Sequence, residues 1–185
     1  MAKTKVLVII SCFFSLMLLL AGAALAQPKV GDNVGNLKFN APLDEEGAKY
    51  LGLAKAAPFT LKDIKADYVL VDVFNTLCPH CIHQAPHLNN LYNLVNQDPK
   101  LKDKIKILAV GTQDNEMKLK AWKVIQKVPF PLIPDEQGQL FNSLNLPGTP
   151  VSLVVDKNGK VHWVHIGAFE SGDGALKEIK QALKL

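Results

Sequence analysis

Two cysteines, Cys78 and Cys81, are the side chains in this sequence best suited to chemistry. They are separated by Pro79 and His80, so their thiols can exchange between a dithiol and a disulfide within one turn of backbone. An apolar run at 68–74 precedes them and a polar stretch with helical spacing follows, which predicts a strand that delivers the pair to a helix N-terminus. The unpaired N–H groups at such a terminus stabilise a thiolate, the nucleophile of thiol–disulfide exchange. The sequence therefore predicts a redox site.

The elements that position this pair alternate between strands and helices. The expected strands are 68–74, 105–110, 151–155 and 160–166, and the expected helices are about 79–97, 114–127, 138–144 and 175–185. The first four of these elements indicate a parallel βαβ unit and an α/β layer architecture. Prolines interrupt the chain at 129–134 and 146–150, and Asn158-Gly159 suits a tight turn between the last two strands. The sheet is therefore expected to end in an antiparallel pair.

The first 26 residues have the pattern of a secretory signal. Two lysines precede an apolar block at 6–20, and small residues at 24–26 form a cleavage site. Residues 6–26 also approach the ~20 apolar residues that span a bilayer, so an uncleaved anchor is an alternative. A lipobox ending at Cys12 is a further alternative, although the apolar block continues past it. We expect cleavage after Ala26 and export to the periplasm or another extracytoplasmic space.

Composition limits the number of domains and the classes of function that the chain can have. Cleavage would remove 26 of the 185 residues and leave 159, enough for one domain with a sizeable core. Only Cys78 and Cys81 of the three cysteines would remain, whereas a chain stapled by disulfides would carry more cysteines at wider spacings. The formal charge of +4 includes the two signal lysines, so the mature value of about +2 indicates no nucleic-acid footprint. All 21 basic residues are lysine, which excludes bidentate recognition of phosphate by arginine.

Further positions stand at characteristic distances from the cysteine pair. They are Asp72 six residues before Cys78, Pro86 five after Cys81, Gly148-Thr149-Pro150, the strand and hairpin at 151–160, and Gly167-Ala168. In these positions the chain resembles the thioredoxin-fold thiol–disulfide oxidoreductases of the extracytoplasmic TlpA/ResA-like group. The resemblance covers 57–185 and implies a thioredoxin-like three-layer α/β/α sandwich with a mixed sheet, in which Pro86 has a structural role. Residues 27–56 are expected to be an irregular lead-in, and one or two short strands are expected between 27 and 66.

The resemblance also implies a role for each site residue. Cys78 would attack a substrate disulfide, and the less exposed Cys81 would resolve the mixed disulfide. Asp72 lies in a strand that is apolar on both faces, so we expect it to be buried. Burial raises a carboxyl pKa towards working pH and suits Asp72 to accept a proton from Cys81. Thr149 and Pro150 would present backbone groups to a substrate peptide if the bond between them is cis.

His80 leaves the direction of electron flow open. An imidazole beside Cys78 favours the thiolate and makes the disulfide more oxidising, and DsbA-type enzymes share Cys-Pro-His-Cys. The rest of the domain resembles reductases, although Leu77 stands where many relatives have tryptophan. We expect a reductase of the cytochrome c maturation type that acts on protein thiols and disulfides and receives electrons from a membrane redox partner. A DsbA-like disulfide oxidase and a copper-binding metallochaperone are the alternatives.

No cofactor and no metal is expected at this site. His83 and His87 share one face of the expected helix, but it is not the face that carries Cys81. A peroxiredoxin would need a proline seven residues and a threonine three residues before its reactive cysteine. Val71 and Asn75 stand at those positions, so the peroxiredoxin pattern is not met.

Overall fold

The computed structural model describes residues 27–41 and 43–185. The expected signal segment, with its anchor and lipobox alternatives, falls on residues 1–26 and so lies outside the described residues. Within the described ranges, no helix has both the length and the apolar character needed to cross a membrane.

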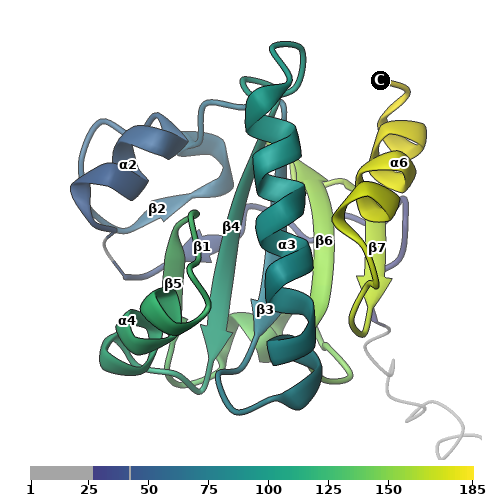
Figure 1. Cartoon of the computed structure of the whole chain (residues 1–185). Helices are drawn as coiled ribbons and strands as arrows, with labels where there is room; N and C mark the ends of the chain where they lie inside the picture. The colour runs from purple at the N-terminus through teal and green to yellow at the C-terminus, as the bar shows by residue number, and fades with distance from the viewer. Residues whose placement is uncertain (1–26, 42) are drawn as a thin grey trace, which may run out of the picture.

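A five-stranded mixed sheet forms the centre of the molecule, with the strand order β5-β4-β3-β6-β7 (Figure 1). The strands are β3 (Tyr68–Phe74), β4 (Ile105–Thr112), β5 (Leu132–Asp135), β6 (Val151–Asp156) and β7 (Val161–Ile166). The pairs β3–β4 and β4–β5 are parallel, while β3–β6 and β6–β7 are antiparallel, as expected for the end of the sheet. The site residues gather at one end of the sheet. This end is formed by the C-terminal ends of β3, β4 and β5 and by the N-terminal end of β6.

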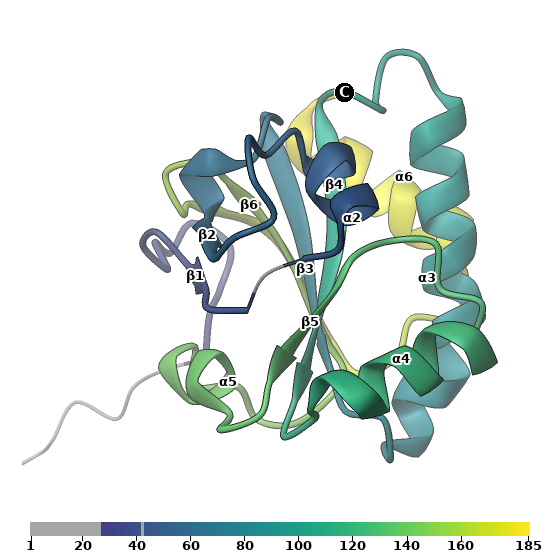
Figure 2. The ribbon, with the colours of Figure 1, turned by 90° about the vertical axis from the view of Figure 1, so that its left-hand side faces the viewer.

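Helices cover both faces of the sheet (Figure 2). One face carries α3 (Pro79–Gln97), α4 (Glu116–Ile125) and α6 (Gly172–Leu183), and the other carries α5 (Gln139–Ser143), the ribbon of β1 (Lys38–Phe39) and β2 (Phe59–Thr60), and a 3-10 turn η1 (Leu61–Asp63). The helix α2 (Glu45–Leu51) lies beside the outer edge of β4, where the Tyr50 hydroxyl accepts from Ile107 N–H at 3.1 Å (Figure 2). Because β3 lies between the two layers, Leu70 and Phe74 enter one core while Val69, Val71 and Val73 enter the other. This position explains why the strand is apolar on both faces.

The lead-in closes against the C-terminal hairpin. Gly31 N–H donates to the carbonyl of Val161, whose own N–H donates to Asp32, and Val34 N–H donates to Gly159, each at 2.9 Å. Gly159 has a φ of 82°, as the expected tight turn requires, and a side chain there would collide with the backbone of Gly35. These bonds join the first described residues to the outer strand of the sheet.

Two elements differ from the sequence prediction. The proline-containing segment at 129–134 was expected only to end a helix, but part of it forms β5, which pairs with β4 at the edge of the sheet. At an edge strand, the missing N–H of a proline removes no hydrogen bond between strands. The helix α2 lies in the lead-in that was expected to be irregular. It has seven residues, with Asp44 accepting from Gly47 N–H at its start and Gly52 in the left-handed conformation at its end. A helix of two turns is too short to show a clear hydrophobic periodicity in the sequence.

Candidate active site

Cys78 is the N-cap residue of α3 and follows the short loop 75–77 that leaves the end of β3. Its Sγ accepts a hydrogen bond from Cys81 N–H at 3.3 Å, and Pro79 takes the first helical position, where a missing N–H is harmless. Partial burial opposes ionisation of this thiol. Hydrogen bonds from the Cys81 side chain and from the N–H groups of Cys81 and His80 outweigh burial, so the pKa of Cys78 is lowered. Cys78 is thus the more reactive thiol of the pair.

Cys81 lies one turn deeper and is only 3 % exposed. Burial raises its pKa strongly, and the hydrogen bond with Cys78 raises it further. Both cysteines are free, so the structure shows the dithiol form. The buried thiol needs a proton acceptor before it can act as a nucleophile.

Asp72 lies on the α3 side of β3 and is 2 % exposed. Burial raises its pKa to about 6, although hydrogen bonds from Ser152 and Gln84 oppose the rise. Asp72 and Cys81 line the same cavity of about 10 Å³, whose other walls are mostly apolar side chains. That volume is at the lower limit for one water molecule. The carboxyl group and the resolving thiol therefore line one small, mostly apolar cavity.

The cis peptide bond between Thr149 and Pro150 lies beside the exposed thiol. Cys78 Sγ donates to the Thr149 carbonyl at 3.3 Å, and the Pro150 carbonyl accepts from Gly167 N–H at 2.9 Å. The start of β6 brings this segment to Cys78 across 71 residues of sequence. The expected pairing of the dithiol with a proline segment is thus present in the geometry.

The loop between β3 and Cys78 is held by a residue that sequence reasoning missed. Asp114 is fully buried and accepts from both the N–H and the hydroxyl of Thr76, each at 2.7 Å. Asn75 adds a hydrogen bond from its amide to the Thr112 carbonyl at 2.8 Å. An aspartate two residues after the neighbouring strand was the available signal. These contacts fix the position of Cys78 from the side of β4.

Three histidines lie near the cysteine pair in α3, at positions 80, 83 and 87. His80 is exposed, and its contribution to the Cys78 thiolate comes from its backbone N–H. His83 contacts Glu170 at 3.1 Å, and its ring lies 5.3 Å from that of His87. No cluster of three or more histidine, cysteine, aspartate or glutamate side chains suited to a metal occurs among the described residues. Pro86 is exposed within α3, which continues through it.

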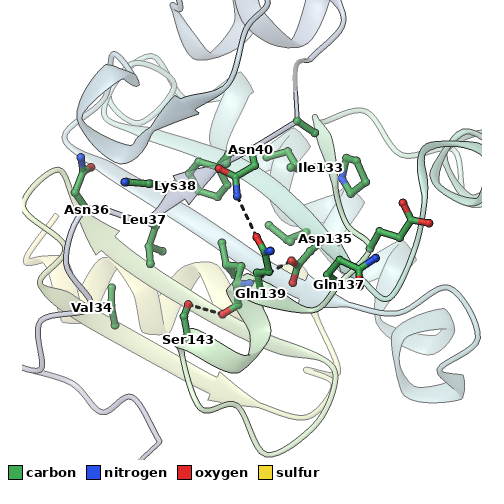
Figure 3. Close-up of a pocket in the computed structure, with 16 residues that line it drawn as sticks. Val34, Asn36, Leu37, Lys38, Asn40, Ile133, Asp135, Gln137, Gln139 and Ser143 are labelled. Carbon is green, nitrogen blue, oxygen red and sulfur yellow. Dashed lines mark hydrogen bonds between the residues drawn. The ribbon is translucent and has the colours of Figure 1, made fainter.

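A larger cavity of about 510 Å³ lies on the opposite face of the sheet, between the lead-in and α5 (Figure 3). Asn40 donates to Gln139 across it, at 3.3 Å. The Asp135 carboxylate in its wall accepts from the N–H groups of Leu140 and Phe141, and so serves the start of α5. Among the described residues that line this cavity, no nucleophile has an activating partner, so the small dithiol site is the better candidate despite its size.

Comparison with known proteins agrees with this geometry. The model of the AhpC/TSA family matches residues 37–164. The thiol-disulfide oxidoreductase ResA of Bacillus cereus strain ZK is 30% identical over 122 residues, which are 64% of this chain and 67% of that protein. ResA of Geobacillus kaustophilus is 26% identical over 113 residues, or 61% of this chain, and the match spans only 62% of that relative's length.

A solved structure shows the same fold. The thioredoxin domain of a thiol-disulfide oxidoreductase from Bacteroides vulgatus superposes with a TM-score of 0.56 at 21% identity, covering 84% of this chain and 99% of that domain. The thioredoxin-like sandwich expected from the sequence is therefore confirmed.

Proposed function

This chain belongs to the AhpC/TSA family, and from that membership and the geometry of the dithiol we propose that it catalyses thiol–disulfide exchange with extracytoplasmic proteins. One observation carries the proposal: a partly exposed thiol with a lowered pKa lies beside the Thr149 carbonyl, while its partner thiol is buried. The names of the ResA relatives support the same activity.

The proposed reaction has two steps. The Cys78 thiolate attacks one sulfur of a substrate disulfide; the substrate S–S bond breaks, and the released sulfur leaves as a thiolate. The mixed disulfide lies against Thr149 and Pro150. Cys81 then loses its proton to Asp72 and attacks Cys78, which releases the second substrate sulfur and leaves a disulfide in the enzyme. Two electrons pass from the dithiol to the substrate.

We propose the reductive direction, as in cytochrome c maturation, with electrons supplied by a membrane partner. Export and any anchoring of the chain depend on residues 1–26, for which the sequence pattern is the support. One observation favours the oxidase alternative: the lowered pKa of Cys78 stabilises the reduced form and so raises the reduction potential. A peroxidase role has less support, because Asn75 stands where a peroxiredoxin would need threonine. The amide of Asn75 instead holds the active-site loop.

Insulin reduction with dithiothreitol tests the activity of the full chain and of variants in which one cysteine of the pair is replaced. Cys78→Ser should abolish catalysis, whereas Cys81→Ser should accumulate a mixed disulfide visible by mass spectrometry. An active Cys78→Ser variant would contradict the mechanism. Equilibration with glutathione buffers then decides the direction, since a potential near the ≈ −120 mV of strong oxidants would exclude the reductase.

A further inference from the structure

Both hydrogen bonds to the buried carboxyl group of Asp72 end on the same oxygen. Ser152 Oγ donates to Oδ1 at 2.6 Å, and Gln84 Nε2 donates to Oδ1 at 2.8 Å. No hydrogen bond joins Oδ2 to any residue that the structure describes. The two oxygens of this carboxyl group are therefore not equivalent.

The orientation of Gln84 is fixed from its other end. Its Oε1 accepts from the backbone N–H of Phe169 at 3.2 Å, so its amide NH₂ must point at Asp72. The side chain is 1 % exposed and cannot turn to solvent. Gln84 thus links Asp72 to the loop after β7, which also contacts Pro150 through Gly167 N–H.

We propose that Gln84 and Ser152 are positioning residues that make Oδ2 of Asp72 the atom that takes the proton of Cys81. A carboxylate oxygen accepts at two lone-pair positions, and both positions of Oδ1 are occupied by these donors. A proton on Oδ1 would displace one of them, whereas Oδ2 is free to receive it. This inference rests on the proposed function, in which Asp72 deprotonates Cys81.

The step is balanced within the dithiol and its substrate. The proton leaves Cys81 Sγ for Oδ2, across the cavity that Cys81 and Asp72 both line, as the sulfur electron pair attacks Cys78. The bond between Cys78 and the substrate sulfur breaks, and that sulfur departs with the electron pair. The proton on Oδ2 then passes to solvent or to the departing thiolate, and the substrate disulfide is the oxidant.

The test follows the resolving step with an aromatic disulfide, 5,5′-dithiobis(2-nitrobenzoate), on the reduced full-length chain with Cys12 replaced by serine, so that only Cys78 and Cys81 react. Attack by Cys78 releases one coloured thiolate, and resolution by Cys81 releases the second, so the two steps give separate phases. The variants are Ser152→Ala, which removes one donor, and Gln84→Met, which removes the other. Gln84→Glu keeps an acceptor for Phe169 but replaces the donor, and Gln97→Glu at the exposed end of α3 is the matched control.

We expect both donor-removing variants to raise the pH midpoint of the second phase by about one unit, because each loses a hydrogen bond to the charged form. Gln84→Glu should raise it further through repulsion of like charges, while the first phase and the control stay unchanged. The Asp72 carboxyl resonance, followed by ¹³C NMR against pH, should show the same displacement in folded protein. An unchanged midpoint in Ser152→Ala and Gln84→Met would overturn the inference. A normal second phase in Asp72→Asn would instead contradict the proposed function.

Discussion

Asp72→Asn should make the protein more stable at neutral pH while it impairs the resolving step. The asparagine has the same shape as the aspartate, and its Oδ1 can still accept from Ser152 and Gln84. It removes only the charge that burial opposes. The expected sign is unusual for a substitution at a buried polar position, where the loss of a charged partner generally destabilises.

The magnitude follows from proton linkage. The folded pKa of Asp72 is raised from 3.8 to about 6, so between those pH values the folded chain holds a proton that the unfolded chain has lost. Stability from this group is full below about pH 4 and falls as the pH rises through about 6. A difference of about two pKa units corresponds to roughly 3 kcal/mol, so the ionised carboxylate destabilises the fold by about that amount at pH 7.5.

Urea unfolding of the reduced protein and of Asp72→Asn, from pH 4 to 7.5 with a phosphine reductant present, measures this. The difference in unfolding free energy should change by about 2.5 kcal/mol in favour of the variant across that range. Any constant penalty for the new amide cancels, because it does not titrate. Asp103→Asn, at an exposed position, is the control and should show no such change. A difference that stays flat with pH would refute the assignment of a buried ionised carboxylate.

Two further predictions concern helix packing and thiol reactivity. Gly172→Ala should lower the unfolding free energy by about 1–3 kcal/mol, because a Cβ there would lie 2.6 Å from the His87 carbonyl oxygen and 2.7 Å from Leu91 N in α3. The control is Gly174→Ala in the same helix, whose Cβ would meet nothing closer than 3.5 Å and should not destabilise the protein. Equal melting temperatures for the two variants would contradict this packing. Iodoacetamide should alkylate the two thiols of the pair at different rates at pH 7. Alkylation of Cys78, measured in Cys81→Ser, should be at least about tenfold faster than alkylation of Cys81, measured in Cys78→Ser. Comparable rates would contradict the pKa order of the two thiols.

The central elements could be predicted because their signals are local. The run at 68–74 is apolar on both faces and ends at the cysteine pair, and β3 and α3 lie where these signals place them. The burial of Asp72 followed from the same strand, since a polar residue between buried neighbours shares their environment.

The missed features depend on contacts that sequence does not display. Ser152 reaches Asp72 because β6 pairs antiparallel with β3, which places the two residues opposite each other. Gln84 follows Cys81 by three residues and shares its helical face, but its partner Phe169 lies 85 residues away. Asp114 likewise acts on a loop from the neighbouring strand.

The backbone bonds between the lead-in and the last hairpin also bear on association between copies of the chain. An outer strand with unpaired N–H and C=O groups is a template for pairing with a second molecule, which leads to aggregation. Residues 31–34 occupy that template at Gly159 and Val161. A chain shortened to 57–185 would uncover it, and β2 would lose β1, its partner strand. The lead-in therefore covers part of the outer strand at the end of the sheet away from the dithiol, and its removal is expected to promote aggregation.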